Sequence, residues 1–273
     1  MLQRTLTAVV LLAAFLAALF WLPRPAFAVL GAVFVGLAAL EWGRLCALAS
    51  AACRAYAAAM VCAFGALFAL AWRGVWTEQD WLAVLFGAAT LFWVVGAPLW
   101  MIRGVGHDAP RLLAAAGFAA LLPAGLALVL LPPPMVLAVL ALVWIADSAA
   151  YFTGRAFGRR KLAPQISPGK TWEGVLGGLL GVELYVIICA FTVPLLDPRP
   201  EGSGFWMLYL GAGAVLCVVS IIGDLFESAV KRQASVKDSG TLLPGHGGVL
   251  DRIDSALAAL PVAALMAYLL GTS

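Results

Sequence analysis

The chain has 273 residues, of which 64% are hydrophobic and only 11% are charged, and its formal net charge is +3. Because soluble domains average about 25% charged residues, this composition excludes an ordinary soluble globular protein. The mean hydropathy of +1.01 instead indicates a protein that crosses a membrane several times, and we expect no nucleic-acid partner for it.

Apolar runs define the predicted elements. A helix needs about 20 apolar residues to cross a bilayer, and lipid offers no partners to an open backbone, so spanning segments are helices. The run at 26–40 is short enough for a tilted or partial crossing. The predicted fold is an all-α polytopic membrane protein, with residues 1–273 in a single integral membrane domain. Nine spans are expected, at 5–22, 26–40, 51–71, 81–102, 112–131, 135–153, 174–196, 205–226 and 255–271.

The first apolar run has a second interpretation. Arg4, an apolar stretch and the tripeptide 26–28 (AFA) resemble a signal peptide with a cleavage site. However, Pro25 crowds that site and another apolar run follows at once. We therefore expect the first span to be retained.

The distribution of Lys and Arg predicts the orientation of the spans. With nine spans, 14 of the 17 basic residues fall on one side of the membrane, and only Arg24, Arg73 and Arg199 fall on the other. Cytoplasmic loops carry the excess of basic residues. We therefore expect a multi-pass protein of the inner (cytoplasmic) membrane, with its N-terminus in the cytoplasm and its C-terminus outside.

Polar chemistry is concentrated in the C-terminal half. Residues 1–135 are rich in Ala, Leu and Val and are expected to act mainly as a scaffold, whereas residues 136–273 are expected to form the catalytic half. Two polar segments of that half, 144–173 and 223–254, face the same predicted cytoplasmic side. We expect the active site at these cytoplasmic helix ends.

Segment 144–173 carries two candidate features. Asp147 falls in the last turns of an apolar helix, where an ionisable group is expensive and suggests a function; a side chain that reaches toward the interface is the alternative. Residues 167–171 (SPGKT) end like a P-loop, but the first glycine of that motif is replaced by Pro164 and no strand precedes it. A Pro-Gly turn before a helix start can still bind an anion, and a plain helix cap is the alternative.

Segment 223–254 places carboxylates at two helix ends. Asp224 and Glu227 share a face at the end of one predicted span, and Asp251 and Asp254 do so at the start of the next. Two such ends, joined by a Gly/Pro loop, can converge on a hard cation. Mg²⁺ takes one or two carboxylates together with phosphate oxygens and water.

The loop between these ends carries groups suited to phosphates. Lys231, Arg232 and Lys237 are charged donors matched to phosphate oxygens, and the Pro- and Gly-rich run 244–248 lets the backbone approach a ligand closely. His246 within that run is either a phosphate donor or a residue that structures the loop.

These residues resemble the signature of a known family, the phosphatidate cytidylyltransferases of bacterial type, also called CDP-diacylglycerol synthases. Residues 228–254 read Ser-x-apolar-Lys-Arg, four residues, Lys-Asp, then Pro-x-His-Gly-Gly-apolar-x-Asp-Arg-apolar-Asp. The stretches 147–155 and 167–174, the Gly223-Asp224 pair and the nine-span layout are also similar to that family. The N-terminal half matches it only in hydropathy and length.

The resemblance implies the transfer of CMP from CTP to phosphatidic acid in the bilayer, giving CDP-diacylglycerol and pyrophosphate in phospholipid biosynthesis. It implies dependence on Mg²⁺, with Asp224 and Asp251 as the metal ligands, and a second, monovalent cation near them is plausible. A homo-oligomer is left open. The residues then expected to be catalytic are Asp224, Asp251, Lys237 and Asp238, and those expected to bind substrate are Asp147, Ser167, Lys170, Thr171, Lys231, Arg232, His246 and Arg252.

Three other functions compete with this one. A transporter needs ionisable groups along its spans, and Glu183 is the only carboxylate near a bilayer midplane; we expect it to be a hydrogen-bond partner for other spans. The CDP-alcohol phosphotransferases carry D-G-x-x-A-R, which residues 147–150 (DSAA) do not match. A CTP-dependent lipid kinase of related architecture remains the alternative, and it differs in releasing CDP instead of incorporating CMP.

Overall fold

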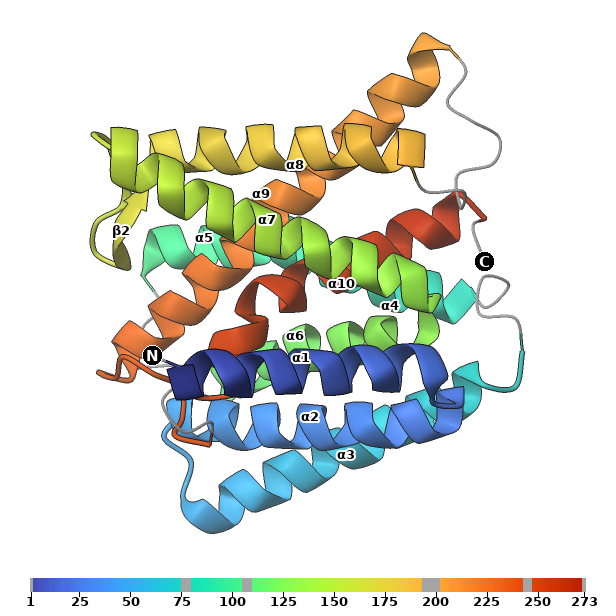
Figure 1. Ribbon diagram of the computed structural model, residues 1–273. Helices are drawn as coiled ribbons and strands as arrows, with labels where there is room; N and C mark the ends of the chain where they lie inside the picture. Colours follow the sequence, from blue (N-terminus) through green and yellow to red (C-terminus); the bar gives the residue numbers. More distant parts are fainter. Residues whose placement is uncertain (1, 75–79, 105–109, 193–201, 243–246, 272–273) are drawn as a thin grey trace.

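The computed structural model describes residues 2–74, 80–104, 110–192, 202–242 and 247–271, with side chains described from residue 9 onward. Figure 1 shows a bundle of long helices with a small hairpin at one end. In chain order the elements are α1 (Leu2–Trp21), α2 (Arg24–Leu45), α3 (Ser50–Ala71), α4 (Asp80–Leu91), the π-helical turn η2 (Phe92–Gly96), α5 (Ala97–Arg103), α6 (Pro110–Leu130), α7 (Pro133–Phe157), β1 (Lys161–Ala163), β2 (Ser167–Thr171), α8 (Trp172–Thr192), α9 (Ser203–Gln233) and α10 (Leu250–Leu269).

The predicted all-α membrane architecture is confirmed. Within the described ranges, eight helical segments are long and apolar enough to cross a membrane, with α4, η2 and α5 counting as one, and α1 adds a shorter apolar stretch at Val9–Trp21. The segment expected at 26–40 is the 22-residue helix α2, which is long enough for a full crossing. α1 packs against the bundle, since Leu19 is buried and the rings of Phe15 and Phe27 lie 6.4 Å apart.

Helix α10 runs through the middle of the bundle. It packs against α9, α6, α4 and α7, and in Figure 1 it lies between the group α7–α9 and the group α1–α3. Small side chains let helix backbones approach closely, and α10 is lined with them. Its fully buried positions include Ala258, Ala259 and Ala264.

The crossing of α9 and α10 depends on Gly223. A Cβ added there would lie 2.6 Å from the carbonyl oxygen of Asp254 and 3.0 Å from Cβ of Ala258. Real Cβ atoms do not come that close to backbone, so only glycine fits at this point. The contact sets Asp224, the next residue, beside the first turns of α10.

An aromatic cluster anchors α9 on its other side. The ring of Phe226 is fully buried, and its centroid lies 5.6 Å from that of Phe92, 5.7 Å from those of Trp93 and Trp100, and 6.4 Å from that of Trp42. Such pairs add to the free energy of burial. The cluster therefore fixes α9 two residues beyond Asp224.

Helices α7 and α8 pack along a seam of glycines. A Cβ at Gly174 would lie 2.9 Å from the carbonyl oxygen of Ala150, and one at Gly178 would lie 3.0 Å from that of Ala146. The close approach holds the end of α7 and the start of α8 together. It thereby supports the hairpin that connects them.

Three local expectations are corrected. Residues 161–171 form the antiparallel hairpin β1–β2, with Lys161 opposite Thr171, where only a turn before a helix was expected. Helix α9 continues to Gln233 and α10 begins at Leu250, so both extend beyond the predicted ends at 226 and 255. Glu183 is not the expected hydrogen-bond partner, since neither of its carboxylate oxygens is hydrogen-bonded to another described residue.

Candidate active site

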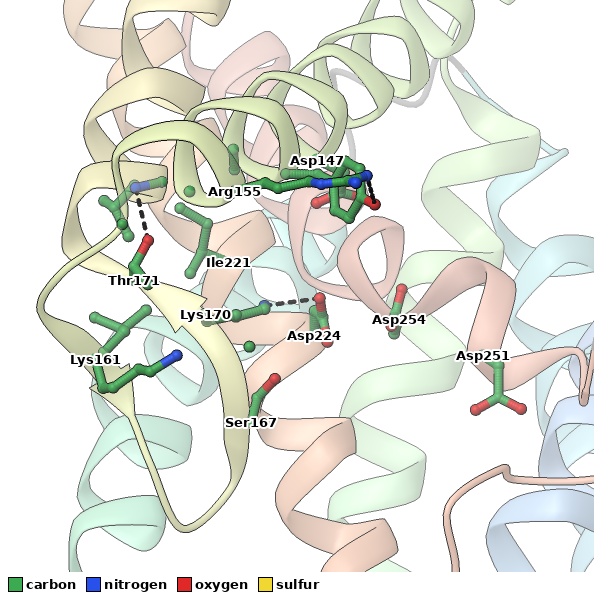
Figure 2. A pocket seen from close by; sticks show the side chains of 18 residues that line it. Asp147, Arg155, Lys161, Ser167, Lys170, Thr171, Ile221, Asp224, Asp251 and Asp254 are labelled. Carbon is green, nitrogen blue, oxygen red and sulfur yellow. Dashed lines mark hydrogen bonds and ion pairs between the residues drawn. The ribbon is translucent and has the colours of Figure 1, made fainter.

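A polar pocket of about 670 Å³ opens between the end of α7, the hairpin, the start of α8, and the facing turns of α9 and α10. Figure 2 shows its side chains converging from these elements. Segments 144–173 and 223–254, which are far apart in the sequence, therefore both contribute residues to this one pocket. The charged residues that line the pocket are Asp147, Arg155, Lys161, Lys170, Asp224, Asp251 and Asp254.

Asp224 holds a central position in this pocket. Its Oδ2 lies 2.7 Å from Nζ of Lys170, which comes from strand β2, and its Oδ1 accepts a hydrogen bond from the hydroxyl of Ser228 at 3.2 Å. The lysine contact is an ion pair without hydrogen-bond geometry. Both side chains are about one-quarter exposed, but Nζ of Lys170 is itself buried.

Asp251 is held much more tightly. Its Oδ1 accepts a hydrogen bond from Nζ of Lys231 at 2.7 Å, and its Oδ2 accepts bonds from the backbone N–H of Ser239 at 2.9 Å and that of Gly248 at 2.8 Å. The hydroxyl of Ser239 is a further donor, 3.0 Å from Oδ2. In Figure 2 Asp251 lies apart from Asp224, with Asp254 between them in the view.

Lys231 does not line the pocket but joins two carboxylates behind it. Besides Asp251, its Nζ contacts Oε2 of Glu227 at 2.8 Å, and the Glu227 side chain is only 2% exposed. A buried charge needs such a partner. In this structure the lysine therefore supports the helix ends instead of facing a ligand.

Thr171 and Glu173 organise the junction between the hairpin and α8. Oγ1 of Thr171 accepts a hydrogen bond from the N–H of Gly174 at 3.1 Å, as a helix N-cap does. The carboxylate of Glu173 accepts bonds from the N–H groups of Arg159 and Arg160 at 3.0–3.2 Å. The helix-cap interpretation of this turn thus holds at Thr171, which also lines the pocket together with Ser167 and Lys170.

The remaining expected site residues lie elsewhere. Arg232 donates through Nε to the carbonyl oxygen of Ile166 at 3.3 Å and so ties α9 to the hairpin turn. Lys237, Asp238 and Arg252 are exposed and are not among the pocket-lining residues. His246 lies outside the described residues, together with the preceding Pro and Gly of its motif. The roles expected for these residues stay predictions.

Residues 2–270 match the cytidylyltransferase family. The chain belongs to that family. It is 40% identical over 287 residues to a phosphatidate cytidylyltransferase of Pseudomonas aeruginosa, covering 98% of this chain and 97% of the relative. It is 39% identical to one of Haemophilus influenzae, over 95% of this chain and 96% of the relative. A phosphatidate cytidylyltransferase of Thermotoga maritima is 46% identical over 126 residues, which is 46% of each chain.

Four residues of this cytidylyltransferase site were not assigned from the sequence. Arg155 and Lys161 line the pocket, but the basic run that contains them is also typical of positive-inside anchoring. Asp254 was seen only as the partner of Asp251. Glu41, on α2, accepts a hydrogen bond from the loop that holds Asp251. In the sequence, the only indication of a role for Glu41 is that it is a lone carboxylate beside a predicted span.

The carboxylates of the pocket are compatible with a bound magnesium ion at Asp224. The described residues contain no ready-made group of three or more His, Cys, Asp or Glu ligands. Mg²⁺ does not need one, because it completes its shell with water and phosphate oxygens. Asp224 fits such a role once Lys170 moves aside, whereas both oxygens of Asp251 already have partners.

Proposed function

We propose that this protein transfers the CMP group of CTP to phosphatidic acid, forming CDP-diacylglycerol and pyrophosphate. The observation that carries the proposal is the pocket that joins basic and acidic side chains from α7, the hairpin, α9 and α10 at the ends of membrane-spanning helices. Family membership and the names of the relatives support a cytidylyltransferase over a CTP-dependent lipid kinase.

The proposed reaction needs no general base. A phosphate oxygen of phosphatidate attacks the α-phosphorus of CTP, and the bond from that phosphorus to the bridging oxygen breaks, so that pyrophosphate leaves with the electron pair. The nucleophile is already anionic near pH 7, because the second pKa of a phosphomonoester is about 6. The main obstacle is the repulsion between two anions, which positive groups must offset.

The basic residues of the pocket are placed to do this. Arg155 comes from α7, and Lys161 and Lys170 come from opposite strands of the hairpin. Charged donors bind phosphate oxygens strongly. In our proposal Lys170 exchanges its contact with Asp224 for a substrate phosphate, and Ser167 provides a neutral donor beside it.

We further propose that Mg²⁺ binds at the carboxylates, with Asp224 as the principal ligand, Asp251 as the second and a monovalent cation close by. Four aspartates against three basic residues line a pocket that has to admit a triphosphate, so additional positive charge is required. The metal would supply charge neutralisation at the phosphates. Asp251 would have to release part of its hydrogen-bonded shell to take part.

The membrane places the two substrates. This multi-pass protein can leave the acyl chains of phosphatidate in the bilayer while the headgroup enters the pocket at the helix ends. We propose that these ends face the cytoplasm, where CTP is found, in the inner membrane, with the N-terminus inside and the C-terminus outside, as the asymmetry of basic residues predicts. The proposal includes a homo-oligomer, and the mass of the protein in detergent solution tests it.

Two forms of labelled CTP test the reaction on purified protein with phosphatidate and Mg²⁺. A cytidylyltransferase moves the α-phosphate label into lipid and releases the γ-phosphate label as pyrophosphate. A lipid kinase moves the γ-phosphate label into lipid and releases CDP. Transfer of the γ label, or no transfer of either, would contradict the proposal.

A further inference from the structure

We infer that Glu41, on the N-terminal helix α2, is a positioning residue for Asp251, an inference that rests on the proposed function of the pocket. Glu41 is fully buried, with 0% exposure, and it is not among the pocket-lining residues. Burying a carboxylate is costly unless hydrogen bonds satisfy its oxygens. Its donors therefore reveal which part of the protein it holds in place.

The first two donors open helix α10. Oε1 of Glu41 accepts a hydrogen bond from the N–H of Val249 at 3.0 Å, and Oε2 accepts one from the N–H of Leu250 at 2.9 Å. The N-terminus of a helix leaves such N–H groups without intrahelical partners and favours a negative charge. Glu41 thus fixes the backbone immediately before Asp251.

The third donor links Glu41 to Asp251 directly. The hydroxyl of Ser239 lies 3.0 Å from Oε2 of Glu41 and 3.0 Å from Oδ2 of Asp251. A hydroxyl carries one proton, so it serves one carboxylate as donor at a time, while the N–H of Ser239 stays bonded to Asp251. The two carboxylates therefore share one residue of the loop between α9 and α10.

Two glycines make room for this arrangement. A Cβ added at Gly240 would collide with the Glu41 carboxylate, and one added at Gly248 would collide with the hydroxyl of Ser239 and the Glu41 carboxylate. Gly248 belongs to the Gly-Gly pair of the signature, which was expected to let the backbone approach a ligand. In the structure, glycine is needed at this position because the side chains of Ser239 and Glu41 lie too close for a Cβ atom.

The chain of contacts runs from α2 through Ser239 and Gly248 to Asp251. Glu41 is separated from all of these partners by about two hundred positions in the sequence. Without it, the N–H groups that open α10 and the hydroxyl of Ser239 lose an acceptor. The loop would then hold Ser239 and Gly248, both donors to Asp251, less firmly, and the orientation of the Asp251 carboxylate would be less well fixed.

The test combines Glu41→Gln with an exchange measurement that does not depend on activity. Gln keeps the size of Glu, but its NH₂ must face at least one N–H donor, so one hydrogen bond is lost. We expect faster amide hydrogen exchange in peptides covering 236–242 and 247–253. We also expect kcat to fall roughly ten- to a hundredfold, as for a lost hydrogen bond to a charged group, with an unchanged KM for phosphatidate. Glu183→Gln, at another carboxylate within the bundle, is the matched control and should change neither.

Ser239→Ala gives a second variant that keeps Glu41 intact. If Glu41 acts through Ser239, the losses in kcat for Glu41→Gln and Ser239→Ala should not add in the double variant. Wild-type activity tests the proposed function separately. The inference is overturned if exchange rises without a fall in kcat, if exchange stays unchanged in Glu41→Gln, or if the two losses in kcat add fully.

Discussion

The hairpin β1–β2 and the loop at 234–249 both look like phosphate-binding segments in the sequence, but they use their polar residues in different ways. The hairpin presents Lys161, Ser167 and Lys170 to the pocket. The loop turns Ser239 and Gly248 inward, toward two carboxylates of the protein itself.

This difference separates contact with a ligand from support of the groups that make contact. Lys170 can exchange Asp224 for a phosphate oxygen, because it already lines the pocket that the phosphate would enter. A buried network cannot do so, since each broken bond leaves a donor or acceptor without water. Substitutions in the hairpin should therefore impair catalysis alone, whereas those in the network behind the loop should also impair stability.

The largest effect on activity is expected for Asp224→Asn. The change keeps shape and removes the charge that would bind Mg²⁺, which supplies several kcal/mol of transition-state stabilisation, so turnover should fall more than about a hundredfold. Yield and monodispersity in detergent should stay near wild type. Asp80→Asn, at an exposed carboxylate that accepts a hydrogen bond from Tyr268, is the matched control. Partial recovery of Asp224→Asn at high Mg²⁺ would indicate weakened ligation, and full activity at ordinary Mg²⁺ would remove Asp224 from the site.

Lys231→Met should act mainly on stability. It leaves Glu227 and Asp251, with side-chain exposures of 2% and 8%, without their shared cation. Breaking a buried ion pair in this way costs about 3–5 kcal/mol. Thermal unfolding in detergent should show a lower midpoint, which the double variant Lys231→Met with Glu227→Gln partly restores. An unchanged midpoint, together with lost CTP binding, would instead make Lys231 a substrate ligand.

Lys170→Met tests whether the hairpin contacts the substrate phosphates. The variant keeps the length of the side chain and loses one charged hydrogen bond to phosphate, worth about 1.5–3 kcal/mol. Activity should fall roughly ten- to a hundredfold with the unfolding midpoint unchanged. Lys170→Arg keeps the charge and should retain part of the activity. If Lys170→Met is fully active, the hairpin serves only to start α8.

The fold was largely predictable from the sequence, because the length of apolar chain needed to cross a bilayer is a local property. The ends of α9 and α10 were not, since charged residues such as Lys231 continue a helix once a partner neutralises them. The hairpin was missed for another reason. Its strands have three and five residues and include Pro168 and Gly169, so they show no alternating pattern.

Within the site, the sequence located residues that are grouped in motifs and missed those that act over long range. Asp224 and Lys170 stand in dense polar stretches, and the structure brings them together. Glu41 stands alone beside an apolar run, and Ser239, Val249 and Leu250, which bond to it, are about two hundred residues away. No local pattern encodes such a contact. The division into a scaffold half and a catalytic half stays a prediction, but the first half supplies this acceptor.

The smallest effect is expected for Lys237→Ala, although Lys237 was among the predicted catalytic residues. Its side chain is exposed and is not among the pocket-lining residues, and exposed charges change free energies by about 0.2–1 kcal/mol. The loss of activity should therefore be no more than about fivefold, well below that of Lys170→Met in the same assay. A loss as large as that of Lys170→Met, with a raised KM for CTP, would show that residues 234–240 close over the nucleotide during turnover. The loop would then be a contact segment like the hairpin, and the distinction between the two regions would fail.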